Sequence, residues 1–343
     1  MNIRKLRHII HRSLEELQAT YDLSRAISLK AALITFRAKI DIQIMNRNGY
    51  KEPESVKKRL MKKHQVMIDF LEYKFKDFWA KYNPLWRDNY PTCDEKLRNK
   101  IWICWWQGIE NAPDIVKACV NSIKRNAREY GVIVITDENC KDYIQFPDWI
   151  LQKYKAGVFS RTHFSDLLRM SILAKYGGIW IDSTFFCTGR SFEDYMKLPL
   201  WSIKRPDYLH ASIASGYFAG YSLGCGYENR WMFAVIRDFL FNYWKECDKL
   251  IDYLLVDYAV VLAQKHNVKI ADAFSKILPN NKYCDELYKV LGQPYDENLW
   301  KHICKDTVLY KLTWKQSFAK EVDGKPTFYG MMINGNLNQV FEK

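Results

Sequence analysis

The chain is organised around residues 160–188, which read SRTHFSDLLRMSILAKYGGIWIDSTFFCT. Apolar residues recur here at helical spacing, which predicts a helix over 162–175 that packs on one face; they are Phe164, Leu167, Leu168, Ile172 and Leu173. Gly177 and Gly178 are expected to end this helix, because glycine adopts left-handed backbone conformations without steric penalty. The apolar run 179–181 then predicts a buried strand that stops at Asp182.

Asp182 is the first candidate for a functional site. In an α/β sheet, ligands usually bind beyond the carboxyl ends of the strands, and this acid follows such an end. Asp166 and Arg169 lie three residues apart on the predicted helix, so both can reach the same crevice with a carboxylate and a guanidinium. A surface ion pair between these two residues is the alternative interpretation.

Two segments carry a family resemblance. SDLLR (165–169) and KYGGIWIDST (175–184) resemble the SDxxR…YGGxYxDxD signature of glycosyltransferases with a DXD motif, in particular the bacterial capsular polysaccharide synthesis proteins. The resemblance covers about residues 100–188 and extends to KLTWK (311–315). Thr184 departs from the signature, because the family has there the second aspartate, the usual direct ligand of Mg²⁺ or Mn²⁺.

The resemblance implies a fold and a set of site residues. It implies a GT-A-like fold and a nucleotide-sugar donor, with Asp166, Asp182 and Asp257 as catalytic acids. It assigns donor binding to the following residues: Trp105, Asn139, Arg169, Gly177, Gly178, Trp180, Thr184, Lys311, Trp314 and Lys315. A divalent cation, Mn²⁺ or Mg²⁺, is expected only at Asp182, and Thr184 puts this metal in question.

The pattern outside the central stretch predicts the rest of the sheet. Apolar runs at 100–106 and 132–136 predict strands, and 114–130 and 147–154 predict helices. This alternation indicates a mainly parallel sheet flanked by helices. After residue 188, strands are predicted at 200–204 and 217–221, tight loops at Gly216, Gly220, Gly224 and Gly226, and helices at 231–243 and 252–264.

Five of the implied site residues also have an ordinary structural interpretation. Trp105 offers an indole face for a nucleobase or belongs to the core, with Trp106 on the opposite face of the strand. Asn139 binds the base or ribose, or forms a turn. Asp257 faces the transferred sugar or lies on a helix surface. Lys311 and Lys315 close over a diphosphate or protect an edge strand.

The first hundred residues form a basic region. They contain 22 lysine and arginine residues against 12 acidic ones, a net +10 of the total of +13. Apolar residues at helical spacing predict amphipathic helices over about 1–89, interrupted at 46–53; they include Leu6, Ile9, Ile10, Leu14, Leu17, Met67, Phe70, Leu71, Phe75 and Phe78. A basic cluster at Lys57, Lys58, Arg59, Lys62 and Lys63 predicts attachment to an anionic membrane surface, with a solvated helix face as the alternative.

Composition limits the class of protein. A hydrophobic content of 48% predicts a globular chain, and nine scattered cysteines without a C-x-x-C pair argue against a disulfide framework or a zinc site. No run of about 18 apolar residues and no signal peptide is present, which predicts a cytoplasmic protein. Residues 1–95 are expected to form a helical accessory region and 96–343 the transferase domain.

The sequence therefore predicts a glycosyltransferase that moves a sugar from a nucleotide-sugar donor to a saccharide or lipid-linked saccharide acceptor, with retention of configuration. A degenerate domain that binds a nucleotide sugar or glycan without turnover is the alternative. Nucleic-acid binding is not expected, because the basic region carries no recognisable nucleic-acid motif. The donor sugar, the base and the acceptor are beyond the sequence.

Overall fold

A five-stranded sheet lies at the centre of the chain in a computed structural model that describes residues 18, 20–82, 93–189, 192–205 and 208–337. The strands follow the spatial order β2-β1-β3-β6-β5. β1 pairs in parallel with both β2 and β3, whereas β6 is antiparallel to β3 and to β5. The bounds are β1 Ile101–Cys104, β2 Val132–Ile135, β3 Gly178–Ile181, β5 Trp201–Ser202 and β6 Ser222–Cys225. The predicted mixed α/β sheet flanked by helices is confirmed.

Alternating side chains divide the interior into two cores, one on each face of the sheet. Trp102 and Trp180 project into one core, whereas Ile101, Ile179 and Ile181 project into the other. This division follows from the geometry of a strand, in which successive side chains point to opposite faces. Both faces are apolar, as expected of strands that helices cover on both sides.

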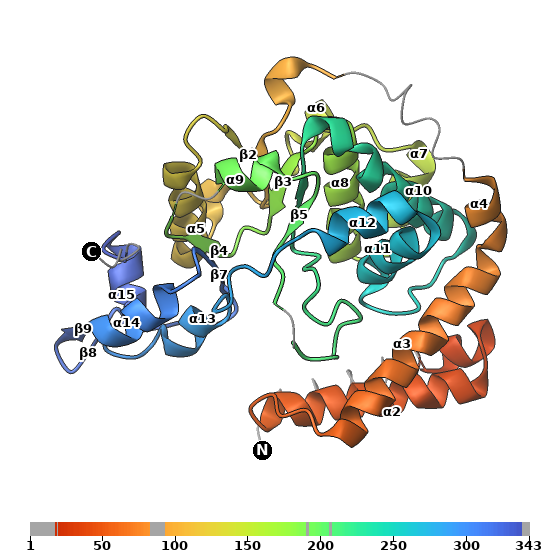
Figure 1. Ribbon diagram of the computed structural model, residues 1–343, viewed down its shortest axis with the longest axis horizontal. Helices are drawn as coiled ribbons and strands as arrows, with labels where there is room; N and C mark the ends of the chain where they lie inside the picture. Colours follow the sequence, from red (N-terminus) through yellow and green to blue (C-terminus); the bar gives the residue numbers. More distant parts are fainter. Residues whose placement is uncertain (1–17, 19, 83–92, 190–191, 206–207, 338–343) are drawn as a thin grey trace.

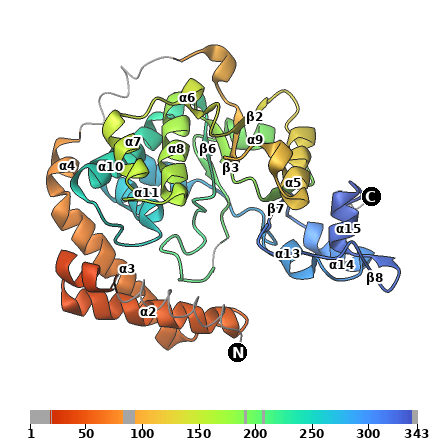
Figure 2. The same ribbon diagram turned by 180° about the vertical axis from the view of Figure 1, so that it is seen from behind.

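Helices cover both faces of the sheet (Figures 1 and 2). The core that contains Trp102 is covered by α6 Cys140–Tyr143, α7 Asp148–Lys155, α8 Arg161–Tyr176, α10 Trp231–Glu246, α11 Leu255–His266 and α12 Val268–Ser275. The core that contains Ile101 is covered by α5 Asp114–Asn126, α9 Phe192–Lys197, α13 Glu286–Val290, α14 Glu297–Cys304 and α15 Phe328–Ile333.

Two small ribbons accompany the main sheet. β4 (Phe185–Cys187) pairs antiparallel with β7 (Leu309–Lys311), and β8 (Glu321–Val322) pairs with β9 (Lys325–Pro326). The β4–β7 pair sets Phe185 opposite Lys311. It thereby brings the KLTWK segment beside the chain that leaves β3, although the two segments are far apart in the sequence.

The amino-terminal part is a helical layer, of which α2 and α3 lie below α11 and α12 in Figure 1. It consists of α2 (Leu29–Arg47), α3 (Glu54–Lys74) and α4 (Lys76–Lys81), and the predicted break at 46–53 separates α2 from α3. Lys63 on α3 forms an ion pair of 2.5 Å with Asp252, and both side chains are buried. The layer is therefore packed against the α/β body. The predicted helical residues Leu6, Ile9, Ile10, Leu14 and Leu17 lie outside the described residues.

The predicted basic cluster is smaller than the sequence indicated. Besides Lys63, Arg59 is engaged, since its Nε donates to Asp41 at 2.6 Å. Lys58 and Lys62 are exposed and Lys57 is half-buried. Three of the five predicted cations thus remain available to a surface. None of the described helices is both long enough and apolar enough to cross a membrane.

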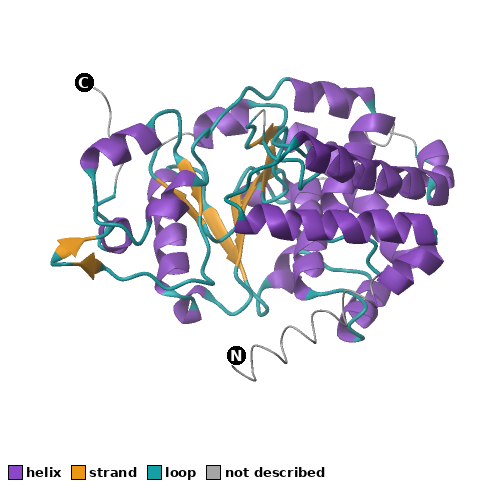
Figure 3. Cartoon of the chain, turned by 90° about the horizontal axis from the view of Figure 1, so that it is seen from below, coloured by secondary structure: helices purple, strands orange, loops and turns teal. Residues whose placement is uncertain are grey.

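One predicted strand is wrong. Residues 217–221 form a loop, and the neighbouring strand β6 occupies 222–225 instead. Gly224, predicted in a tight loop, lies within β6 opposite Ile179, where an added Cβ would approach Ile179 Cγ1 to 2.8 Å. Glycine is therefore needed there for close pairing of the strands. Figure 3 shows the strands of the central sheet between helices on either side.

Candidate functional site

Two glycines direct the chain from α8 into β3. Gly177 and Gly178 have φ angles of 63° and 88°, as the sequence predicts for a helix that ends in a sharp turn. A Cβ at Gly178 would lie 2.1 Å from the carbonyl oxygen of Lys100, so no other residue fits. Both glycines lie at the start of β3, roughly 13–17 Å of extended chain from Asp182. They position the strand, and their contact with the donor stays a prediction.

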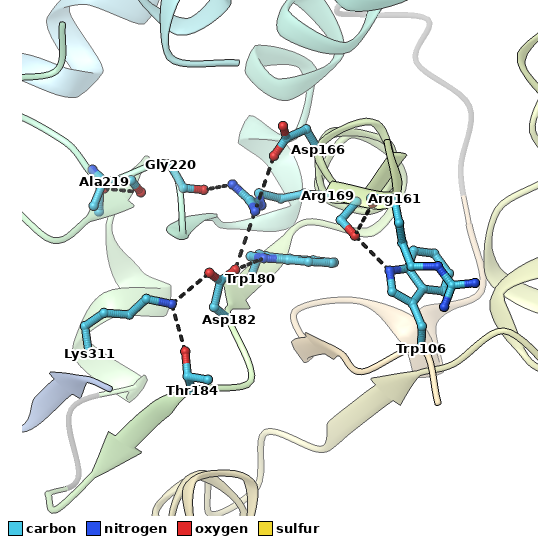
Figure 4. Close-up of polar contacts among 12 residues, drawn as sticks. Trp106, Arg161, Asp166, Arg169, Trp180, Asp182, Thr184, Ala219, Gly220 and Lys311 are labelled. Atoms are coloured by element: carbon cyan, nitrogen blue, oxygen red, sulfur yellow. Dashed lines mark hydrogen bonds and ion pairs between the residues drawn. The ribbon is translucent and has the colours of Figure 1, made fainter. Parts of the chain in front are cut away.

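Asp166 and Arg169 are buried side chains of α8, with 9% and 7% exposure. Arg169 Nη2 lies 3.5 Å from Asp166 Oδ1 and 3.5 Å from Asp182 Oδ1. Its Nη1 donates to the carbonyl oxygen of Gly220. Burial excludes the surface ion pair that the sequence left open, and Arg169 instead links the two acids (Figure 4).

Asp182 follows β3 and is held on both carboxylate oxygens. Oδ1 accepts from Trp180 Nε1 at 3.2 Å, and Oδ2 accepts from Lys311 Nζ at 2.9 Å. Burial acts to raise the pKa of Asp182, but Lys311 and Arg169 outweigh it, so this pKa is lowered below the ordinary value of 3.8. Asp182 is therefore ionised at neutral pH.

Trp180 is a buried residue that contacts both Asp182 and Arg169. Its side chain is 1% exposed and lies in the core, with Arg169 5.4 Å from the ring centroid. In this position the indole fixes Asp182 and Arg169. Direct contact between Trp180 and the donor stays a prediction.

Lys311 and Thr184 occupy the place where the family signature has its second aspartate. Lys311 Nζ donates to Thr184 Oγ1 at 2.9 Å and to Asp182 Oδ2 at the same distance. An ammonium group thus bridges the two side chains that a divalent cation would have to share. No group of three or more histidine, cysteine or acidic side chains in the described part of the chain could hold a metal ion. These donors do not fit a resident Mg²⁺ or Mn²⁺, which prefer several anionic oxygens.

Asp257 lies in the first turn of α11 and is buried, which excludes the helix-surface alternative. Its Oδ2 accepts from Ser212 Oγ at 3.0 Å. Burial raises the pKa of Asp257 to about 6, against the hydrogen bond from Ser212 and the charge of Arg169. The chain passes very close on one side, since a Cβ at Gly220 would lie 2.6 Å from Asp257 Oδ1.

Asp166 has the strongest shift of the three acids. Burial raises the pKa of Asp166 to about 7; Arg169 opposes this effect, and the charges of Asp257 and Asp182 add to it. At neutral pH, Asp166 is therefore a mixture of its protonated and its ionised form. Three acids of different protonation, with one arginine among them, are typical of sites that perform chemistry.

A single cavity of about 270 Å³ joins these residues. It is lined by Asp166, Arg169, Asp182 and Asp257, so the structure brings together the three predicted catalytic acids and the predicted arginine. Its other walls contain residues that sequence reasoning missed: Thr162, Arg205, Tyr208, Ser212, Tyr221 and Tyr253.

Arg205 is the most prominent of the missed residues. Its Nη1 is paired with Asp285, and its Nη2 donates to Tyr221 Oη at 2.7 Å. Tyr208 Oη also donates to Asp285, at 2.8 Å. These residues lie up to 80 positions apart and share no motif. Only the folded chain places a second buried guanidinium at the cavity.

The predicted nucleotide-binding residues lie outside this cavity. Trp105 follows β1 and is half-buried, and its ring meets that of Trp314 edge to face with centroids 5.8 Å apart. Trp314 is 47% exposed and Lys315 is exposed. Trp105 Nε1 has no hydrogen-bond partner in the described chain. Trp106 points away, as predicted, and donates from Nε1 to Ser165 Oγ at 2.9 Å.

Asn139 closes the turn after β2. Its Oδ1 accepts from the amide of Thr136 at 2.9 Å, and its Nδ2 donates to the carbonyl of Val134 at 3.0 Å. These contacts are those of the turn former that the sequence offered as the alternative. Contact between Asn139 and a base stays a prediction.

The fold and the site together define an α/β protein with a cavity lined by three acids beyond the carboxyl end of a central strand. A family model described as capsular polysaccharide synthesis protein matches residues 47–332, and the chain therefore belongs to that family. The match includes α3 of the helical layer as well as the sheet. Neither the curated proteins nor the solved structures contain a match.

Proposed function

We propose that this protein is a GT-A-type glycosyltransferase that moves a sugar from a nucleotide-sugar donor to a saccharide or lipid-linked saccharide acceptor in capsular polysaccharide synthesis. One observation carries the proposal. Asp166, Asp182 and Asp257 come from three separate elements and meet, with Arg169, in one cavity at the end of β3. Membership of the family supports a role in capsular polysaccharide synthesis, and the residues of the cavity support sugar transfer as the reaction.

Sugar transfer requires that negative charge on the leaving diphosphate be stabilised. The bond from the anomeric carbon to the diphosphate oxygen breaks, and its electron pair stays on that oxygen. Lys311 and Arg169 are the cations nearest to Asp182, at 2.9 Å and 3.5 Å. We assign them the charge stabilisation that a metal supplies in relatives with two acidic residues, and Lys315 is a further candidate at the exposed edge.

The acceptor hydroxyl forms the new bond to the anomeric carbon and loses its proton. Asp257 suits the role of proton acceptor, because a pKa of about 6 leaves it mostly ionised at pH 7 yet more basic than an ordinary aspartate. Asp166, with a pKa of about 7, suits hydrogen bonding to sugar hydroxyls as donor or acceptor. Retention of configuration is carried over from the family resemblance.

Trp105 and Trp314 are assigned to the nucleotide base. The half-exposed Trp314 and the unpartnered Nε1 of Trp105 offer an aromatic face and a hydrogen-bond donor close together. Lys315 lies next to Trp314 in the chain and is exposed, which makes it a candidate for phosphate binding.

A donor screen tests this function. Wild-type protein is incubated with UDP-, GDP- and CMP-sugars, and both its melting temperature and the release of nucleotide are measured. A transferase is stabilised by at least one donor and turns it over, since a ligand stabilises in proportion to RT ln(1 + [L]/Kd). Stabilisation without turnover, even with capsular oligosaccharide present, supports the degenerate binding protein, which the Thr184–Lys311 contact favours. No stabilisation by any donor overturns the proposal.

A further inference from the structure

The wall of the cavity is held by a part of the chain outside it. The segment 208–216, between β5 and β6, contributes Tyr208, Ser212 and Gly216 to the cavity. Its residue His210 does not line the cavity and instead contacts Glu52, which lies just before α3 in the helical layer. Glu52 Oε1 accepts from the His210 amide at 2.8 Å, and Oε2 accepts from His210 Nδ1 at 2.8 Å.

His64 on α3 also contacts His210. Its Nε2 lies 2.9 Å from the carbonyl oxygen of His210, and its Nδ1 lies 2.6 Å from Tyr258 Oη. Burial and the neighbouring Lys63 lower the pKa of His64 to about 4, so its ring is neutral at pH 7. A carbonyl only accepts, so Nε2 carries the proton, and Nδ1 accepts from the hydroxyl of Tyr258.

These contacts place both partners of one catalytic hydrogen bond. Ser212 is two residues beyond His210, and Asp257 immediately precedes Tyr258. Lys63, adjacent to His64, pairs with Asp252, whose Oδ1 accepts from the amide of Leu254 just before α11. The helical layer therefore grips the loop that carries Ser212 and the start of the helix that carries Asp257.

We propose that the helical layer is a positioning element of the cavity, in which Glu52 and His64 fix His210 and thereby set the hydroxyl of Ser212 against Asp257. The inference rests on the proposed function for its catalytic meaning. It gives the layer a role that needs no membrane or other partner. Glu52 and His64 touch no reacting atom and are positioning residues.

The contact between the helical layer and the His210 loop predicts how the rate depends on pH. The groups that face Asp257 are Arg169 and Asp166 on α8, Lys63 on α3, Asp252 and Tyr253 before α11, Tyr258 on α11, and the hydroxyl of Ser212. Among them, only the Ser212 bond depends on the His210 loop. Because that bond favours the carboxylate, its loss raises the pKa of Asp257. The acidic limb of the pH–rate profile then moves to higher pH.

The test compares four variants of the full chain. Glu52→Ala removes both acceptors for His210, and Ser212→Ala removes the hydroxyl itself. Glu52→Gln retains an oxygen acceptor for the His210 amide and presents an N–H to Nδ1, which accepts in its other tautomer. Glu54→Ala is the matched control, an exposed acid two residues away. Hydrogen–deuterium exchange over 208–221 and the pH–rate profile with the donor from the screen are measured for each.

Glu52→Ala is expected to speed exchange in 208–221, lower kcat about tenfold and shift the acidic limb upward, in the same direction as Ser212→Ala. Adding Glu52→Ala to Ser212→Ala is expected to cause no further shift. Glu52→Gln and Glu54→Ala are expected to behave as wild type. If Glu52→Ala does not fold, His210→Ala replaces it; it removes the Nδ1 contact alone, so smaller changes in the same directions are expected.

Unchanged exchange in Glu52→Ala overturns the inference, as does faster exchange with an unaltered kcat and pH profile. If wild-type protein turns over no donor, the proposed function fails, and the exchange data alone decide whether the layer holds the loop. The two failures are thereby distinguished.

Discussion

Lys311 Nζ donates to Asp182 Oδ2 at 2.9 Å, which joins the end of β3 to a strand that comes 129 residues later in the chain. The same nitrogen contacts Thr184, the residue that replaces an acid in the family signature. Compared with the family signature, the second acid is replaced by Thr184, and the ammonium group of Lys311 lies beside Asp182, the acid that remains. The site is thus arranged for a fixed positive charge.

This arrangement predicts weak metal dependence and strong dependence on Lys311. EDTA is expected to leave measurable turnover, because the charge of Lys311 does not require a bound ion. Lys311→Met is expected to raise the donor Kd about tenfold or more, roughly 1.4 kcal/mol, with a small change in melting temperature. Lys305→Met, an exposed lysine, is the control. Loss of all turnover in EDTA, its recovery with Mn²⁺ and a fully active Lys311→Met would together restore the metal to its usual role.

Asp166 predicts a change of stability with pH. Its folded-state pKa of about 7 lies above the ordinary 3.8, so between about pH 4 and pH 7 the native state binds more protons than the unfolded state. The contribution of Asp166 to stability therefore falls as pH rises through this window. Asp166→Asn is expected to gain stability relative to wild type between pH 4 and pH 8, by about 1 kcal/mol or more, while turnover falls at least about tenfold. Chemical denaturation at both pH values measures the difference, and a constant difference would contradict the shift.

Gly220 predicts a steric effect on the same cavity. Alanine at this position would place its Cβ 2.6 Å from Asp257 Oδ1, so the carboxylate must move. Gly220→Ala is expected to reduce turnover at least about tenfold. Gly226→Ala is the matched control, since its Cβ would lie 3.6 Å from the carbonyl oxygen of Met196, an ordinary van der Waals contact. Equal activity of the two variants would show that Asp257 tolerates displacement.

The basic face of α3 predicts binding to anionic vesicles. Lys57, Lys58 and Lys62 are the members of the cluster that are not paired with Asp41 or Asp252. Replacing all three with glutamine is expected to weaken co-sedimentation with vesicles that contain anionic lipid. Binding by wild type should fall from low to physiological salt, where the screening length is about 8 Å. The same triple change at Lys301, Lys305 and Lys325 is the control, and salt-independent binding, or none, supports a solvated face.

The sequence predicted those parts of the fold that local pattern determines. The helix 162–175, the strand 179–181 and the two glycines were found from periodicity and backbone preference. The strand predicted at 217–221 is in fact 222–225, because both segments combine apolar residues with a glycine and pairing with β3 decides between them. Strand propensity alone does not predict which segment pairs with β3.

The site was predictable only where it lies in the signature or in a local pattern. Asp166, Arg169 and Asp182 belong to one continuous stretch, and Asp257 was found as an acid within an apolar run. Arg205 and Ser212 were missed, because their hydrogen-bond partners are far away in the sequence. Arg205 contacts Asp285 and Ser212 contacts Asp257, and each partner lies more than 40 positions along the chain. The contact of Trp180 with Asp182 was not predicted, because the sequence does not reveal which side chains meet around a buried strand.

Asp182 provides the most direct test of the central claim that sugar transfer takes place in this cavity. The measurement is the rate of product formation by Asp182→Asn and by wild type, with the donor found in the screen and with melting temperature as the check on folding. The account predicts a folded Asp182→Asn protein with a rate at least about tenfold lower, which corresponds to roughly 1.4 kcal/mol of transition-state stabilisation. A folded variant that transfers sugar at the wild-type rate would place the reaction elsewhere on the molecule.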